Sequence, residues 1–117
     1  MAIRIVLLGS DRFNRVAALR SKGYAVDECY SVAELHSSLV GVLPTDAIAI
    51  AESDAAVIDS ATSLARAISA APLILFENGA QHPNPGEFDL LIPANAAEQH
   101  WLSDIAQLVA RTSKRNR

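Results

Sequence analysis

The sequence is poor in several residue types, and each scarcity excludes a class of protein. The single cysteine, Cys29, allows no internal disulfide, so we expect a reducing compartment such as the cytoplasm. No apolar run is long enough to cross a bilayer. The net charge of −3 gives no general attraction to nucleic acid. Only 5% of the residues are aromatic, so the core is expected to be aliphatic.

The 117 residues are half hydrophobic, which is enough for one domain with a core of its own. We expect this domain to occupy residues 1–112. Residues 113–117 form a basic tail with Lys114, Arg115 and Arg117. Such a tail is typical of a solvated helix end, and it is also compatible with a linker to a further domain.

Apolar segments alternate with amphipathic ones along the whole chain. The apolar segments predict five β-strands, at 3–9, 25–31, 46–52, 72–77 and 88–93. The segments between them carry helical periodicity and capping signals. Ser10 precedes the first apolar stripe, Ser31 followed by Glu34 precedes the second, and Ser53 or Asp54 precedes the third. This order predicts an α/β protein, a three-layer α/β/α sandwich of the flavodoxin-like type with a parallel sheet of order 2-1-3-4-5.

In such sheets ligands bind beyond the carboxyl ends of the strands. The polar residues expected at that edge are Ser10, Asp11, Glu52 and Ser53. They are candidates for holding a ligand in the strand-end crevice. Gly9 stands without a glycine-rich phosphate motif, and His36, His82 and His100 have no metal-ligand spacing. We therefore expect no metal ion and no cofactor.

The layout resembles the receiver domain of bacterial two-component response regulators, of the CheY-like superfamily. The resemblance rests on the order of strands and helices, on the third-strand run DAIAIA, and on Pro93 directly after the fifth strand. It covers roughly residues 3–112. It implies a signalling module in which an aspartate at the end of the third strand accepts a phosphoryl group, beside acids that bind magnesium.

The residues that the resemblance requires are absent from the matching positions. The acid pair falls on Gly9 and Ser10, and the phosphoacceptor falls on Ala51. The hydroxyl position falls on Phe76, and the lysine position falls on Ile92. The resemblance therefore implies a degenerate pseudo-receiver, which lacks the phosphorylation motif.

An offset of one residue would bring Asp11 and Glu52 into the acid positions, yet it supplies no lysine. The chain has only Lys22 and Lys114, and neither lies near the fifth strand. Because phosphoryl transfer depends on placed charge, we expect no aspartyl chemistry and no enzymatic activity. Glu52 is interpreted either as a mimic of a phosphorylated aspartate or as a solvated loop acid.

Two features suggest contacts with a protein partner. The resemblance implies a fourth helix between the fourth and fifth strands, but Pro83 and Pro85 interrupt that segment, so we expect the helix to be shortened or missing. Gln81, His82 and Asn84 in this loop are candidate partner contacts, although the loop is equally compatible with a trimmed connection. Trp101 is a further candidate contact, or a core residue on its helix stripe.

The sequence thus favours a receiver-like signalling module that binds protein, with a kinase or an output domain as partner and a homodimer as a possible assembly. The alternative is a flavodoxin-like domain that binds a small molecule or a nucleotide in the strand-end crevice.

Overall fold

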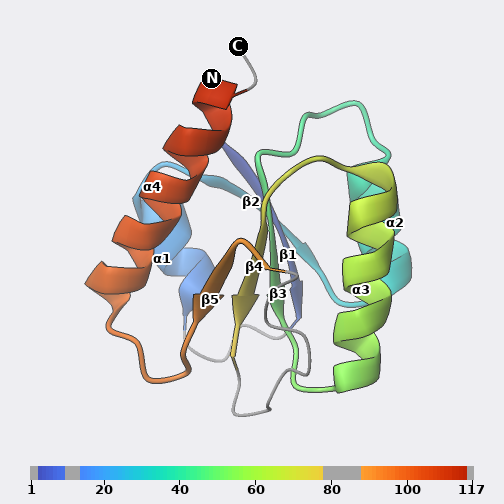
Figure 1. Cartoon of the computed structure of the whole chain (residues 1–117), viewed down its shortest axis with the longest axis horizontal. Coiled ribbons are helices and arrows are strands. Elements are labelled where there is room, and N and C mark those ends of the chain that lie inside the picture. Colours follow the sequence, from blue (N-terminus) through green and yellow to red (C-terminus); the bar gives the residue numbers. More distant parts are fainter. Residues whose placement is uncertain (1–2, 10–13, 78–87, 116–117) are drawn as a thin grey trace.

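The computed structural model describes residues 3–9, 14–77 and 88–115, and it shows a single parallel sheet between two layers of helices (Figure 1). The strands are β1 (Arg4–Gly9), β2 (Ala25–Cys29), β3 (Ala47–Ala51), β4 (Leu73–Phe76) and β5 (Leu90–Ile92). The helices of the described part are α1 (Arg15–Ser21), α2 (Val32–Leu39), α3 (Ala55–Ile68) and α4 (Glu98–Arg115).

The sheet has the strand order β2-β1-β3-β4-β5 with every pair parallel. The predicted flavodoxin-like architecture is therefore confirmed. Most residues between β4 and β5, namely 78–87, lie outside the described part, and the described residues beside them form no helix. The predicted shortening or loss of a helix concerns this stretch and therefore stays a prediction.

The alternation of side chains along the strands divides the core into two clusters. Odd-numbered β1 residues, such as Ile5 and Leu7, face α1 and α4 together with Phe76. Even-numbered residues, such as Val6 and Leu8, face α2 and α3. Because both faces are covered, the central strands are apolar throughout, which explains the continuous hydrophobic runs in the sequence.

The helix starts follow the capping signals in two cases out of three. Ser31 Oγ accepts a hydrogen bond from the Glu34 amide at 3.1 Å, and Asp54 Oδ1 accepts one from the Ala56 amide at 2.9 Å. Helix α1, however, begins only at Arg15, and not next to Ser10 as expected. The residue before it, Asn14, has a left-handed backbone with φ 54°, which a short polar side chain tolerates.

Helix α4 carries the predicted apolar stripe into the core, with Trp101, Leu102, Ile105, Leu108 and Val109 all buried. The helix continues to Arg115, so residues 113–115 of the expected tail are helical. None of the described helices is long and apolar enough to cross a membrane.

The amino-terminal edge of the sheet holds a polar network around Arg4. The Arg4 guanidinium donates to Thr45 Oγ1 at 2.9 Å, and its side chain is paired with the Asp27 carboxylate. It also donates to the carbonyl oxygens of Ser38 at 3.3 Å and Leu43 at 3.4 Å. This buried side chain therefore holds the segment between α2 and β3 against the sheet.

Two aspartates connect neighbouring strands at the same edge. Asp46 accepts from the Arg4 amide through its carboxylate at 2.8 Å, while its own amide donates to the Arg4 carbonyl at 2.9 Å. Asp89 does the same with Leu73, at 2.8 Å and 2.9 Å. Each aspartate thus satisfies both backbone groups of a residue at the start of the adjacent strand.

Candidate functional site

The residues expected at the receiver positions form one row across the carboxyl edge of the sheet. Gly9, Ala51, Phe76 and Ile92 are each the last residue of their strand. Gly9 pairs in register with Ala51, and Phe76 pairs with Ile92. The β3–β4 register reaches Ile50 and Leu75, directly before Ala51 and Phe76. The predicted strands 46–52, 72–77 and 88–93 each ran one residue beyond the observed end, and the strand 3–9 ended where predicted.

The row is buried and apolar. Ala51, Phe76 and Ile92 belong to the core cluster that faces α1 and α4. None of the four positions offers a carboxylate, a hydroxyl or an ammonium group. At these positions the carboxyl edge of the sheet therefore continues the hydrophobic core.

Gly9 is required by the backbone as well as by the packing. Its φ of +124° lies in a region that residues with a side chain rarely adopt. A Cβ atom at this position would lie 2.3 Å from the carbonyl oxygen of Ala51. With this backbone, any side chain at position 9 would clash with the Ala51 carbonyl, which explains why glycine ends the first strand.

Phe76 is enclosed by two side chains from the covering helices. The Trp101 ring meets it edge to face, with 5.3 Å between the ring centroids. The guanidinium carbon of Arg15 lies 4.3 Å from the centroid of the Phe76 ring, a cation–π arrangement. Arg15 is itself only 3% exposed. A positive charge is thus placed beside the strand ends, from the first residue of α1.

Sequence reasoning missed Arg15, because it counted lysines and looked for a cation near the fifth strand. The signal was present: Arg15 precedes Val16 and stands four residues before Leu19, so it begins the buried stripe of α1. A charged residue at the start of a core-facing stripe could have been marked as a buried cation.

The candidate crevice residues are only partly described. Glu52 is half-buried and Ser53 is exposed. Asp54 is engaged as the cap of α3. Ser10 and Asp11 lie outside the described residues, as do the loop candidates Gln81, His82 and Asn84. The expectations for those five residues therefore stay predictions.

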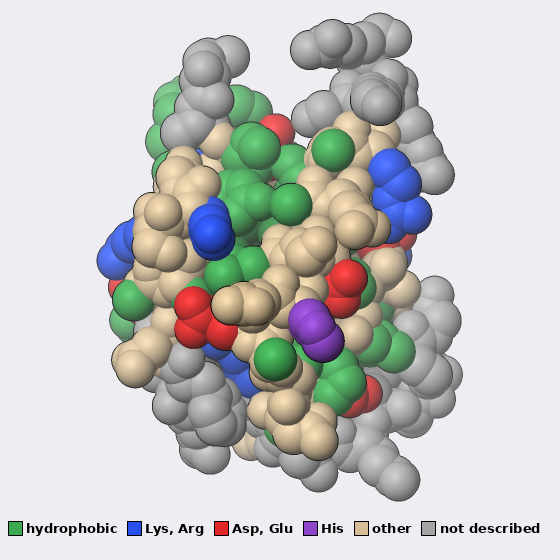
Figure 2. All heavy atoms as spheres, turned by 90° about the vertical axis from the view of Figure 1, so that its left-hand side faces the viewer, with side chains coloured by type: hydrophobic (Ala, Val, Ile, Leu, Met, Phe, Trp, Pro, Cys, Tyr) green, Lys and Arg blue, Asp and Glu red, His purple; other side chains and the backbone are tan. Residues whose placement is uncertain are grey.

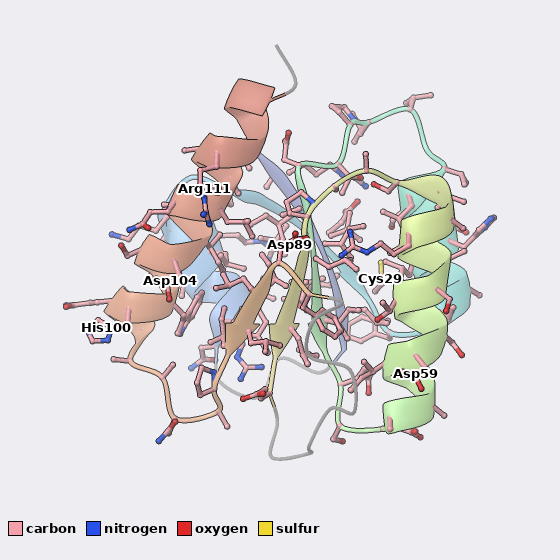
Figure 3. All side chains as sticks on the ribbon, viewed as in Figure 1. Cys29, Asp59, Asp89, His100, Asp104 and Arg111 are labelled. Carbon is pink, nitrogen blue, oxygen red and sulfur yellow. The ribbon has the colours of Figure 1, made fainter. Side chains whose placement is uncertain are left out.

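Other reactive groups do not gather into a site within the described residues. No group of three metal-ligating side chains occurs there. Figure 3 shows His100 and Asp104 along the outer side of α4, away from Cys29, which lies on the side of the sheet that α2 and α3 cover. Burial raises the pKa of the Cys29 thiol, so it stays protonated at neutral pH.

The face formed by α1 and α4 is hollowed between the two helices. The groove has a volume of about 610 Å³, and its walls include Lys22, Tyr24, Leu102 and Ala106. Figure 2 shows this face, with hydrophobic side chains gathered in its upper half among polar ones. Trp101 lies beneath this surface with 6% of its area exposed, which favours its interpretation as a core residue.

Solved receiver domains share this fold along nearly the whole chain. The response regulator receiver domain protein (CheY-like) from Methanospirillum hungatei JF-1 superposes with a TM-score of 0.80 at 13% identity, covering 98% of this chain and 99% of that chain. The N-terminal domain of a response regulator/sensory box/GGDEF three-domain protein from Carboxydothermus hydrogenoformans gives 0.77 at 12% identity, with 97% and 99% covered. The receiver domain of the TMAO respiratory system response regulator TorR gives 0.71 at 16% identity, with 94% and 98% covered.

No model of a known protein family matches the chain, and no curated protein sequence matches it. At identities of 12–16% the likeness to solved structures is one of fold. The chain has the fold of response regulator receiver domains, and its chemistry has to be argued from its own residues.

Proposed function

We propose that this chain is a receiver-like signalling module that accepts no phosphoryl group and acts by binding another protein. The observation that carries the proposal is the apolar row at the carboxyl edge of the sheet. Phosphoryl transfer needs carboxylates for a metal ion and a cation on the moving oxygens. In place of these groups stand Ala51, Phe76 and Ile92, which belong to the core, and the buried Gly9.

Arg15 is a buried cation near the strand ends, but it stands at the start of α1 and not at the fifth-strand position that the resemblance assigns to the lysine. Its guanidinium carbon lies 4.3 Å from the centroid of the Phe76 ring, on the side of the sheet that faces α1 and α4. The cavity that it lines contains Ile92, Pro93 and Trp101, and neither Ala51 nor Glu52. These contacts place the Arg15 side chain next to the β5–α4 connection.

The surface for partner binding is proposed to be the face of α1 and α4. The groove there combines apolar atoms of Leu102 and Ala106 with polar groups at its margins, such as Lys22 and Glu98. A groove of this kind suits a helix or a loop of a kinase or an output domain. A second copy of the chain is the alternative occupant, which light scattering on the free protein would detect.

Incubation with Mg²⁺ and acetyl phosphate tests the proposal, with intact mass as the measurement. We expect no added phosphoryl group, and no amide shift at Gly9, Ala51 or Phe76 when beryllofluoride replaces acetyl phosphate. A receiver with an intact motif, treated in parallel, shows that the reagents are active. A phosphorylated species that disappears in Glu52→Gln or Asp54→Asn would overturn the proposal.

A further inference from the structure

The connection between α2 and β3 exposes an uninterrupted apolar segment to solvent. Its residues 40–44 have the sequence VGVLP, and all five are exposed. Val42 is fully exposed, and Val40 and Leu43 are exposed over 58% and 60% of their surface. Single exposed apolar side chains are ordinary, but a contiguous group of them is typical of a binding surface. We call residues 40–44 the VGVLP loop.

The base of the VGVLP loop is fixed by Arg4, while its side chains remain in solvent. Arg4 donates to the Ser38 carbonyl before the loop at 3.3 Å, and to Thr45 Oγ1 after it at 2.9 Å. It also donates to the Leu43 carbonyl at 3.4 Å. These bonds use backbone groups of the loop and leave the Val42 side chain exposed. A loop that is already held in place loses less conformational freedom when it binds.

Cations gather at the same end of the molecule as the VGVLP loop. Lys22 follows α1 and lies near the start of β1, since the Ala25 amide donates to the Ile3 carbonyl at 2.8 Å. Figure 1 shows the end of α4 at the top of the view, as is the α2–β3 connection. Cations at helix ends are favoured by the helix dipole, which explains part of this charge. The last part of α4 is basic in sequence, with Arg111, Lys114 and Arg115.

The acidic side chains at this end are engaged within the chain, whereas two cations are not. Each of three aspartates forms an ion pair or accepts a hydrogen bond from the adjacent strand: Asp27, Asp46 and Asp89. Lys22 and Arg111 are exposed, and neither forms an ion pair with another described residue. The uncompensated charge near the VGVLP loop is therefore positive, although the whole chain has a net charge of −3.

An exposed aliphatic loop near cations suits an anionic lipid surface better than a folded protein partner. Protein interfaces gain most of their energy from aromatic and arginine side chains that fill pockets. The VGVLP loop has neither residue type, and it lines neither the groove of α1 and α4 nor the cavity beside β5. Aliphatic side chains can enter the boundary between headgroups and acyl chains, while lysine and arginine bind anionic headgroups.

We propose that the VGVLP loop docks this protein onto membranes that contain anionic phospholipid. Val42 and Leu43 enter the headgroup boundary, and Lys22 and the basic end of α4 lie over the headgroups. The binding is peripheral and reversible, because only a few side chains enter the lipid. It goes beyond the proposed binding of a protein partner, since the VGVLP loop forms no part of the groove between α1 and α4.

Co-sedimentation of the full chain with vesicles tests the proposal. Vesicles of phosphatidylcholine and phosphatidylglycerol in equal parts are compared with vesicles of phosphatidylcholine alone. We expect binding to the anionic vesicles that is at least about tenfold tighter than to the neutral ones. Added sodium chloride should weaken this binding, because salt screens the attraction between the cations and the headgroups.

Three double or single variants separate the apolar contribution from the charge. Val42→Ser with Leu43→Ser removes the apolar side chains and keeps the carbonyl that accepts from Arg4, so affinity for anionic vesicles should fall at least about tenfold. Lys22→Gln with Arg111→Gln should cause a loss of about the same size. Tyr30→Ser is the control, since Tyr30 is 63% exposed and lies at the opposite edge, before the cap of α2. It should bind as the parent protein does.

The changed positions are all exposed, so circular dichroism should show that each variant keeps its fold. Binding to anionic vesicles that requires both the VGVLP loop and the cations supports the proposal. A parent protein that fails to bind these vesicles would overturn it, as would a serine variant that binds as tightly as the parent. A dimer in light scattering that the serine variant dissociates, without vesicle binding, would assign the loop to a second copy of the chain. A phosphorylated species in the acetyl phosphate experiment would overturn the proposed function and leave this surface unaffected.

Discussion

The two edges of the sheet differ in polarity, and the polar groups gather at the edge opposite to the one that is usual for this fold. In open α/β sheets ligand chemistry collects beyond the carboxyl ends of the strands. Here β1, β3, β4 and β5 end in Gly9, Ala51, Phe76 and Ile92, which are all buried. The amino-terminal edge carries the extended polar network, centred on Arg4.

The difference shows that position in a fold and chemistry at that position are separate properties. The amino-terminal network stabilises the fold, since its partners are backbone carbonyls and side chains of the same chain. At the carboxyl edge, the described ends of β1, β3, β4 and β5 are buried and carry no charged side chain. An assignment of function from the fold alone would have predicted reactive side chains at strand ends where this chain has buried apolar residues.

The largest expected effect comes from opening the apolar edge at Phe76. Phe76→Ala removes a fully buried ring together with its contacts to Trp101 and Arg15, and should lower the free energy of unfolding by about 3–5 kcal/mol. Urea unfolding followed by circular dichroism measures this loss. Phe76→Leu, which keeps most of the volume, should cost roughly 1 kcal/mol. Equal losses in both variants would contradict the role given to the ring.

The second prediction concerns Gly9, where the backbone conformation and the nearby Ala51 carbonyl should disfavour any side chain. Gly9→Ala places a Cβ against the Ala51 carbonyl at a positive φ, and should cost about 3 kcal/mol. Gly23→Ala is the matched control, since Gly23 also has a positive φ of +90° but no atom within 4 Å of the added Cβ. It should cost only about 1 kcal/mol, from the backbone conformation alone. Similar losses at the two glycines would show that the close approach is unimportant.

A smaller effect is expected at the polar edge. Arg4→Met leaves the carbonyl groups of Ser38 and Leu43 without this donor, and should lower the free energy of unfolding by about 2 kcal/mol. The Asp27 carboxylate is half exposed, so water can solvate it after the change. Arg66→Met, at an exposed pair with Asp89 3.7 Å apart, should change stability by less than about 1 kcal/mol. If the two arginines prove equivalent, the Arg4 network is no more than surface charge.

Much of the fold could be predicted from the sequence, because local signals and the overall pattern agree. Apolar runs marked the central strands, and Ser31 and Asp54 marked helix starts that the structure confirms. The start of α1 was misplaced, because Ser10 is a good capping residue and nothing in the local pattern shows that Asn14 adopts a left-handed backbone.

The approximate position of the strand ends could be predicted from the sequence, but the side chains that gather beside them could not. The strand ends follow from hydrophobic patterning, which placed the ends of β1, β3, β4 and β5 to within one residue. The stacking of Arg15 on Phe76 joins residues from α1 and β4, far apart in the chain, and depends on which way one helix faces. The cavity beside it depends on the path of the β5–α4 connection, which no residue pattern defines.

The two aspartates at the amino-terminal edge also bear on how reliably the strands align during folding. A slip by one position would turn each strand's side chains to the opposite face. Asp46 and Asp89 each bind one residue of the adjacent strand through both a side chain and an amide, so a misaligned strand forfeits two bonds at once. The two aspartates thereby favour the native alignment of β3 on β1 and of β5 on β4.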